Sequence, residues 1–335
     1  MPTPSVSVIV TARNEEQNVN RCVSALLKQE YPNYTILFVD AGSRDDTLRI
    51  AEGMAVDSPN LKVIRFQGNP SQCRNMAVGM TSSEVVAFTD ADVVVPPTWL
   101  SQTVETLLSK PEIGGVGGPN EPTRKQSSEV IKTVDLMLTT SLGSMKSAQS
   151  YDFKDKTVVK SIPCCNAAYR RQLLIEVGGF DEELVGCDDT DLGYRITRAG
   201  GKILFDPKAK VLHSVKFGTL RQFAALMFKY GRGRGYAAKK KRYLFSGPAI
   251  PAAGLIVGVP LLLVVTVMSR SFLPLAILLA GYLAAVGGYS VGVAVSRKAS
   301  NVAFLGPVVL TTEYMSYFIG FLAGLIDRRP NRWST

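Results

Sequence analysis

The sequence predicts an α/β fold with a parallel, doubly wound sheet, followed by a membrane-embedded carboxyl-terminal region. Two observations support this prediction. In the first part of the chain, short apolar segments rich in β-branched residues alternate with amphipathic helical patterns. Beyond residue 245, three long apolar blocks hold almost all of the apolar excess of a 335-residue chain that is 46% hydrophobic. We therefore expect a soluble α/β domain at 1–215, an amphipathic, polybasic interfacial segment at 216–245, a transmembrane region of about three helices at 246–327, and a tail at 328–335.

Strands and helices alternate along the α/β part. The predicted strands are apolar runs, and the predicted helices place apolar residues three or four positions apart. Asp45, Asp46 and Thr47 are short polar residues of the kind that caps free amides at a helix start. Because this alternation requires crossovers, the strands should be parallel. The predicted elements are strands Ser5–Thr11, Thr35–Val39, Leu61–Phe66 and Glu84–Thr89, and helices Asn18–Lys28, one opening at Asp45, and Ser71–Met80.

The segment Val85–Asp92, VVAFTDAD, is the most informative part of the chain. A buried strand ends here on Asp90 and Asp92, and open α/β sheets bind ligands at the carboxyl ends of their strands. Two carboxylates in the turn that follows can converge on Mg²⁺ or Mn²⁺, which prefer oxygen ligands. Taken alone, an Asp-x-Asp pair is more often a solvated turn or helix cap.

Charge and glycine patterns exclude several classes of protein. The net charge is +10, and nine basic residues but no acidic one lie between Lys216 and Arg242, directly before the apolar blocks. A polybasic segment in that position favours an anionic membrane surface over nucleic acid as the partner. Neither a dinucleotide-binding glycine fingerprint after the first strand nor a phosphate-binding P-loop occurs.

The cysteines indicate a reducing compartment. Their number is odd and no Cys-x-x-Cys spacing occurs, so neither a zinc site nor a disulfide framework is predicted. We expect small, reduced, buried residues of a cytosolic domain. The amino terminus enters a strand directly, which does not resemble a signal peptide. The cysteines are Cys22, Cys73, Cys164, Cys165 and Cys187.

For two amphipathic segments, the sequence fits both a protein core and a membrane surface. Ser127–Met145 has a helical apolar pattern that fits either a core helix or a helix on the membrane. A second apolar stripe runs from Leu220 to Tyr230, with Arg221 and Lys229 beside it. This combination is typical of an interfacial helix, and an ordinary core-facing helix fits equally well.

The three apolar blocks, Ala249–Met268, Phe272–Val295 and Val302–Ile326, are each long enough to cross a bilayer. Arg270 is the only charged residue that separates the first two blocks, so they should form a tight hairpin. The run Lys239–Arg242 before them places the front domain in the cytoplasm by the positive-inside rule.

The third block is the ambiguous one. If it spans the membrane, Arg328, Arg329 and Arg332 lie outside, against the positive-inside bias. Glu313 also sits near its middle, where a charge is costly unless it is paired or faces a polar cavity. A third span is the preferred interpretation, and a re-entrant or interfacial segment is the alternative.

Acidic residues in the front domain gather at strand ends and in one dense cluster. This distribution differs from the even scatter of unrelated surface acids. The polar constellations are Asp40 with Ser43, Asp45 and Asp46; Asp90 with Asp92; Gly178–Glu182 leading into Cys187–Leu192; and His213, the only histidine.

In their order and spacing, these motifs resemble those of a membrane-anchored, non-processive family 2 glycosyltransferase of the GT-A fold. The resemblance covers roughly Pro4–His213. SVIVTARNEE is similar to the family's opening strand and nucleotide-binding loop, and VDAGSRDDT to its second strand and turn. CRNMAVGMTSSEVVAFTDAD resembles the Arg-Asn helix that leads into the Asp-x-Asp strand. GGFDEELVGCDDTDLGYRI resembles the acidic motif on the acceptor side, and VLHSV supplies the later histidine.

The resemblance implies a role for each matching residue. Asp92 should hold a divalent ion, Mn²⁺ or Mg²⁺, which offsets charge on the departing nucleoside diphosphate. His213 either completes the metal shell or is a hydrogen-bonded structural residue. The implied contacts with the nucleotide-sugar donor, a UDP- or GDP-sugar, come from Ala12, Asn14, Glu15, Asp40, Ser43, Arg74 and Asp90.

Asp189 is the implied general base, with Asp188 beside it. The family usually carries Glu-Asp where this chain has Asp188-Asp189, so the first carboxylate is shorter here. Crowding with Asp191 would raise one pKa and help a base to accept a hydroxyl proton. Asp191 also fits a helix-capping role. Because a hydroxyl must be deprotonated and a lipid phosphate is already ionised, the motif favours a sugar hydroxyl as acceptor.

A basic stretch, Lys229–Arg234, lies where processive members carry Gln-x-x-Arg-Trp, and the Trp is missing. A processive synthase is therefore not favoured. Arg232 and Arg234 either grip a diphosphate or belong to a basic loop that faces the membrane.

Together these features predict an inverting, metal-assisted enzyme at the cell membrane with its catalytic domain in the cytoplasm. Its acceptor would be a membrane-associated, lipid-linked saccharide, and nucleic acid is not a predicted partner. The alternatives are a polyprenyl-phosphate sugar synthase and a non-catalytic, nucleotide-sugar-binding membrane sensor. The sensor is disfavoured because a binder does not need a base.

Overall fold

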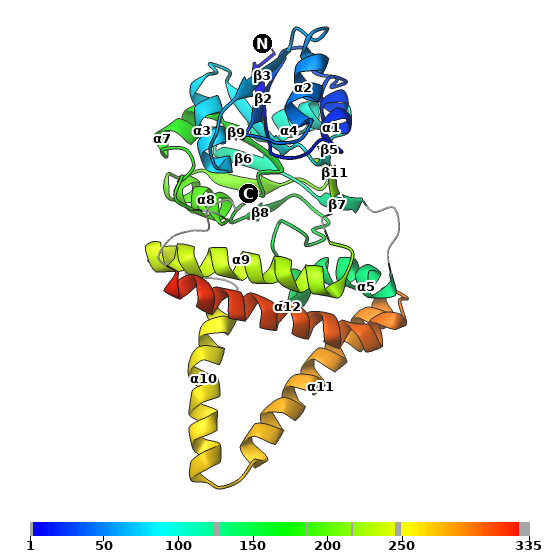
Figure 1. Ribbon diagram of the computed structural model, residues 1–335, viewed down its shortest axis with the longest axis vertical. Coiled ribbons are helices and arrows are strands. Elements are labelled where there is room, and N and C mark those ends of the chain that lie inside the picture. The colour runs from blue at the N-terminus through cyan, green and yellow to red at the C-terminus, as the bar shows by residue number, and fades with distance from the viewer. Residues whose placement is uncertain (1–2, 124–127, 185, 216, 245–248, 328–335) are drawn as a thin grey trace. The chain divides into compact units, whose positions relative to one another are not determined.

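A computed structural model (Figure 1) describes residues 3–123, 128–184, 186–215, 217–244 and 249–327. The chain divides into two compact units. We call the first, which contains the described residues of 1–124 and 147–215, the α/β unit. The second, which contains those of 125–146 and 216–330, is the helical unit. The predicted tail at 328–335 lies outside the described residues.

Four parallel strands form one half of the main sheet, in the order β3-β2-β1-β4. The predicted β-α-β-α alternation is confirmed here, because a helix follows each of the first three strands along the chain on its way to the next. The apolar side chains of β1 and β4 are buried on both faces, as in other parallel sheets, whereas Val63 and Ile64 of β3 are only partly buried. The elements are β1 Val6–Ala12, α1 Val19–Leu26, β2 Tyr34–Asp40, α2 Thr47–Ala55, β3 Leu61–Arg65, α3 Pro70–Gly79 and β4 Val85–Asp90.

The other half of the sheet, beyond the four strands predicted to be parallel, is mixed. β9 (Asn166–Arg170) runs antiparallel to both β4 and β6, and β8 is antiparallel to β10. The full order is β3-β2-β1-β4-β9-β6-β10-β8. The remaining elements of this half are β6 Ile113–Gly117, β8 Thr157–Val159, β10 Lys202–Phe205, α4 Trp99–Leu108, α7 Arg171–Glu176 and α8 Asp188–Arg198.

A second, three-stranded sheet has the order β5-β11-β7. β5 (Val93–Val94) follows the Asp-x-Asp segment directly and pairs antiparallel with β11 (Val211–Ser214), which runs parallel to β7 (Asn120–Thr123). This small sheet joins the carboxyl end of β4 to a strand more than a hundred residues later. It thereby sets the surroundings of Asp92.

The helical unit contains two short helices and four long ones. The predicted helix at Ser127–Met145 is interrupted, because Thr140 caps a new helix through a hydrogen bond from the Gly143 amide. The three apolar blocks form three helices, as predicted. The elements are α5 Glu129–Leu138, α6 Ser141–Ser144, α9 Leu220–Lys240, α10 Ala249–Met268, α11 Leu273–Ser296 and α12 Asn301–Ile326, with a 3₁₀ turn at Arg242–Leu244.

Among the described residues, α11 and α12 are long and apolar enough to cross a membrane. Within the unit, α10 and α11 form a hairpin joined by a short turn, and α9 and α12 lie side by side (Figure 1). The two helix pairs differ in charge. Helix α9 carries basic residues, while α10 and α11 carry no charged residue within their bounds.

Candidate active site

The loops after β1 and β2 are fastened to each other at the carboxyl edge of the sheet. Ala12 ends β1, and Asn14 follows with φ of 56°, a left-handed conformation that asparagine tolerates better than most residues. The Asn14 amide donates to Ser43 Oγ at 3.0 Å, and the Glu15 amide donates to Thr47 Oγ1 at 2.7 Å. Three of the residues predicted to contact the nucleotide therefore come from one connected pair of loops.

Asp40 lies at the bottom of this pair of loops with only 2% of its surface exposed. Its Oδ2 accepts hydrogen bonds from the amides of Gly42 and Ser43, both at 3.1 Å. Its Oδ1 is buried and has no hydrogen-bond partner among the described residues. A buried carboxylate oxygen without a donor is costly, so Asp40 is suited to receive an N–H or O–H group from a ligand.

Arg74 links the donor side of the site to the acidic motif. Its guanidinium lies 2.9 Å from Asp188 Oδ2 and 3.3 Å from Asp90 Oδ1, and it stands over the ring of Phe180. Burial alone disfavours the guanidinium charge, but the surrounding acidic groups, Asp188 and Asp90 among them, raise the pKa of Arg74 above its usual value. Ser71 adds a hydrogen bond to Asp188 at 3.3 Å. Arg74 is thus a charged link between two residues, Asp90 and Asp188, that lie far apart in the sequence.

Asp92 and His213 are brought together by the small sheet. His213 pairs with Val93 across the β5–β11 ladder, and its Nε2 lies 3.4 Å from Asp92 Oδ1. A carboxylate and an imidazole at this separation are ligands that Mn²⁺ or Mg²⁺ accepts, and diphosphate oxygens commonly supply the rest of such a shell. The described residues hold no cluster of three or more histidine, cysteine or acidic side chains that suits a metal. The residues present therefore fit a shared metal site that a donor would complete.

Asp90 differs from Asp92 in its surroundings. Burial raises the pKa of Asp90 above its ordinary value, and Arg74 acts in the opposite direction by favouring the charged form. Thr11 Oγ1 approaches Asp90 Oδ1 at 3.5 Å. The two carboxylates of the Asp-x-Asp segment thus have separate partners, an arginine for Asp90 and a histidine for Asp92.

The acidic motif forms the first turn of α8. Cys187 precedes it with φ of 87°, so the chain turns sharply before Asp188. Asp191 is fully buried and forms an ion pair with Arg195 at 2.7 Å, which makes it a structural residue of α8. Asp188 and Asp191 thus both have arginine partners. Asp189 Oδ1 accepts from the Thr190 amide at 2.6 Å.

Asn75 is a functional candidate that the sequence analysis missed. Its Nδ2 donates to the Phe180 carbonyl, and its Oδ1 accepts from the Phe180 amide, both at 2.8 Å. A β-carbon on Gly179 would lie 2.6 Å from Asn75 Oδ1, so glycine is required there for this approach. Asn75 thus holds the loop that leads to the acidic motif. Its place beside Arg74 in the Arg-Asn helix was the available signal.

Arg232 and Arg234, predicted to bind a diphosphate, belong to α9 in the helical unit. Arg232 forms an ion pair with Asp327, with Nη2 and Oδ1 at 3.2 Å. A role in binding diphosphate stays a prediction for both residues. Of the five cysteines predicted to be buried, four are buried and Cys187 is partly exposed.

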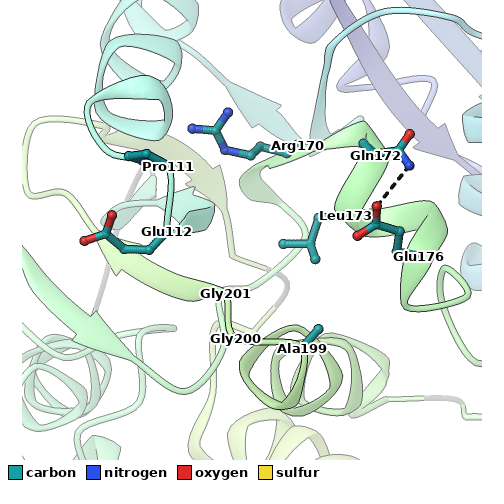
Figure 2. Close-up of a pocket in the computed structure, with 9 residues that line it drawn as sticks. All are labelled: Pro111, Glu112, Arg170, Gln172, Leu173, Glu176, Ala199, Gly200 and Gly201. Carbon is teal, nitrogen blue, oxygen red and sulfur yellow. Dashed lines mark hydrogen bonds between the residues drawn. The ribbon is translucent and has the colours of Figure 1, made fainter.

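A separate pocket of about 290 Å³ lies beside α7 in the α/β unit (Figure 2). Its lining contains none of the predicted site residues. The guanidinium of Arg170 donates there to the carbonyls of Leu107, Lys110 and Ile113, so it is already committed to the backbone. Figure 2 also shows Gln172 hydrogen-bonded to Glu176. The pocket is a crevice between structural elements and does not compete with the strand-end site.

The sheet, the Asp-x-Asp strand end and the acidic turn define a nucleotide-diphospho-sugar transferase architecture. The chain belongs to glycosyl transferase family 2, whose model matches residues 7–178. Among curated proteins, it is 29% identical over 237 residues to glycosyltransferase AglE of Haloferax volcanii, covering 69% of this chain and 73% of the relative. It is also 29% identical over 211 residues to a β-monoglucosyldiacylglycerol synthase of Nostoc, covering 58% of this chain and 41% of that enzyme.

Solved structures share the fold. The mannosyltransferase PcManGT of Pyrobaculum calidifontis, in complex with GDP-Man and Mn²⁺, matches with a TM-score of 0.64 at 20% identity, covering 97% of this chain and 88% of that one. Residues 1–349 of TarS from S. aureus, in complex with UDP-GlcNAc, match with a TM-score of 0.50 at 20% identity, covering 69% and 66%. At these identities the likeness establishes the fold.

Proposed function

We propose that the protein transfers a sugar, with inversion, from a nucleotide-diphospho-sugar to a hydroxyl of a membrane-associated, lipid-linked saccharide. The observation that supports this most is the position of Arg74, which contacts Asp90 at the Asp-x-Asp strand and Asp188 of the acidic turn. Through this one side chain, the donor motif and the motif of the base belong to a single site. The complexes of structural neighbours with GDP-Man and UDP-GlcNAc support a nucleotide sugar as donor.

On the donor side, Asp40 Oδ1 would accept a hydrogen bond from the base or ribose, since it has no partner among the described residues. Asn14 and Glu15 would border the same nucleotide. Asp90 would contact the ribose or the sugar, and Arg74 would keep its carboxylate oriented. A guanidinium with two fixed carboxylate partners costs little reorganisation during the reaction.

The reaction is an in-line displacement at the anomeric carbon. The acceptor oxygen forms a bond to that carbon as the bond to the β-phosphate oxygen breaks, and the hydroxyl proton passes to the Asp189 carboxylate. The nucleoside diphosphate leaves with the electron pair. Asp92 and His213 would hold Mn²⁺ or Mg²⁺, which supplies charge neutralisation for that leaving group.

The acceptor and the location follow from the helical unit. The hairpin of α10 and α11 would anchor the enzyme in the cell membrane, and the basic run Lys239–Arg242 before it favours a cytoplasmic catalytic domain. A membrane anchor keeps the site near lipid-linked acceptors. The similarity to glycolipid synthases agrees with such an acceptor.

The test is turnover by the full chain in detergent against a panel of UDP- and GDP-sugars, with membrane lipid extract as acceptor. We expect release of one nucleoside diphosphate with Mn²⁺ or Mg²⁺ and none with EDTA. Asp189→Asn should lower transfer by about 10³-fold, within the range for loss of a general base. Asp57→Asn, at an exposed position, is the matched control.

Two results would count against the proposal. Transfer to the lipid extract that survives Asp189→Asn would point to a polyprenyl-phosphate acceptor, whose phosphate needs no base. Donor binding without turnover under all conditions would point to a nucleotide-sugar sensor.

A further inference from the structure

Helix α12 has two opposite sides of different character. After Asn301, its exposed residues are all apolar: Phe304, Val308, Met315, Ile319 and Ile326. At 3.6 residues per turn, these five positions fall within about 60° of one another. The buried side is opposite and includes Glu313, the only charged residue of the helix, and the glycines Gly306, Gly320 and Gly324.

The buried side of α12 packs against α9 at backbone contact distance. A β-carbon on Gly320 would lie 2.1 Å from the Phe228 carbonyl oxygen, and one on Gly324 would lie 2.1 Å from that of Arg232. The reverse contacts are equally close, because Gly231 faces Tyr317 and Gly235 faces Phe321. Both helices therefore use a Gly-x-x-x-Gly pair, and the contacts advance in the same direction along both, so the helices run parallel.

Helix α9 is unsuited to the hydrocarbon core. It carries basic residues along its whole length and no acidic residue, with Arg221, Lys229 and Lys239 exposed. Charged side chains at the centre of a bilayer are costly. Because the glycine contacts hold the two helices together, α12 must lie at the same depth as α9.

Contacts on another part of α12 agree with this depth. Glu129 of α5, an exposed acidic residue, accepts a hydrogen bond from the first residue of α12 at 2.8 Å. Further along, Tyr314 donates to the Leu142 carbonyl at 3.0 Å. These partners belong to α5 and α6, and α5 also exposes Lys132. On its protein side, α12 is thus bordered by α5, which exposes charged residues.

We infer that α12 lies in the plane of the membrane surface with its exposed apolar side against the lipid, and that it is not a third span. The occupant of this side is an anionic phospholipid bilayer. The uncharged side of α12 suits its acyl region, and the basic residues of α9 suit its headgroups. Only four residues separate α12 from α11, so α12 begins where the hairpin leaves the membrane. This topology also places Arg328, Arg329 and Arg332 on the same side as Lys239–Arg242, in accord with the positive-inside rule.

The first test measures depth along the helix. Phe304→Cys, Met315→Cys and Ile326→Cys are spin-labelled in the full chain, in vesicles containing phosphatidylglycerol, and accessibility to oxygen and to a soluble nickel complex gives each depth. We expect one shallow depth at all three sites. A spanning helix would place the outer two about 33 Å apart along the membrane normal, with the middle site deepest, which would overturn the inference.

Helix α11 provides the matched control. Leu273→Cys, Leu283→Cys and Val295→Cys are exposed positions with nearly the same spacing, and they should show the shallow, deep, shallow profile of a span. Unlabelled parent chain, carrying its native cysteines through the same reaction, gives the background.

A second test measures sidedness in intact cells. Thr335→Cys should be protected from a membrane-impermeant maleimide until the cells are permeabilised, while Ser271→Cys, between α10 and α11, reports the opposite side. Labelling of Thr335→Cys in intact cells would overturn the inference.

Discussion

The two units of this protein treat apolar side chains in opposite ways. In the α/β unit, residues such as Ile9, Phe38 and Phe88 are fully buried between the sheet and its helices. In the helical unit, residues of the same kinds, among them Phe272 and Phe304, are about four-fifths exposed. Such exposure is unfavourable in water and acceptable in lipid. The exposed apolar helices of the helical unit therefore suggest membrane association.

The close contacts of the two units differ in the same way. The α/β unit holds its site together with buried charges, of which the Arg74 pairs are the clearest. The helical unit brings α9 and α12 together through close glycine contacts, beside which Ala238 and Phe321 are buried. A variant that removes the Arg74 ion pairs should leave the helical unit intact, and one that disturbs the glycine contacts should leave the α/β unit intact. This allows the comparison to be tested.

The largest effect is expected for Arg74→Ala. It leaves Asp90 and Asp188 without their partner in a buried site, and loss of one member of a buried ion pair costs about 3–5 kcal/mol. Transfer should fall by about 10³-fold, because both motifs lose their orientation. The measurements are turnover and thermal unfolding of the purified chain.

Arg49→Ala is the control, since Arg49 forms an exposed pair with Asp46. Such pairs contribute little, so neither turnover nor the unfolding temperature should change. Equal effects of the two substitutions would show that burial of Arg74 does not matter.

How much the sequence predicts depends on how local the signal is. The four parallel strands, their helices and the three apolar helices follow from periodicity within each segment, and the structure has them close to the predicted bounds. Asp45, Asp46 and Thr47 are predicted to open a helix, and α2 begins at Thr47. Asp46 is at its N-cap without a side-chain capping bond, while Asp45 Oδ1 accepts from the Thr47 amide at 3.1 Å. These features need no knowledge of distant residues.

Contacts between residues far apart in the chain could not be predicted from the sequence. The antiparallel insertion of β9 between β4 and β6 depends on which edges are free once the sheet forms. The ion pair of Arg74 with Asp188 joins residues 114 positions apart. The Asp-x-Asp strand end was predictable because strand ends bind ligands. The Arg-Asn helix pointed to Asn75, but its hydrogen bond to the backbone of a distant loop was not predictable.

The second-largest effect, a loss of stability, is expected for Gly324→Ala in the helical unit. The added methyl would collide with the Arg232 carbonyl oxygen, and overpacking of this kind costs about 1–3 kcal/mol. Unfolding in detergent, followed by circular dichroism of the full chain, should occur at a lower temperature.

Gly292→Ala in α11 makes the same chemical change where no atom lies within 4 Å. Because alanine favours a helix over glycine by about 1 kcal/mol, this variant should be unchanged or slightly stabilised. If Gly324→Ala behaved like Gly292→Ala, the α9–α12 contact would not be the one that holds the unit together.

The smallest effect is expected for Asn75→Ala, which tests whether the α/β unit positions its acidic turn through polar contacts. The variant removes the paired hydrogen bonds to Phe180, at about 1 kcal/mol each, and leaves the catalytic carboxylates in place. If Asn75 is a positioning residue, kcat should fall about tenfold while the KM for the nucleotide sugar stays the same, because the donor loops are not touched. A purely structural role would instead lower the unfolding temperature and leave kcat of the folded fraction unchanged. Asn75→Asp keeps the acceptor for the Phe180 amide but loses the donor to Phe180 and brings a second carboxylate close to Glu182 Oε1. Its kcat should therefore fall at least as far as that of Asn75→Ala.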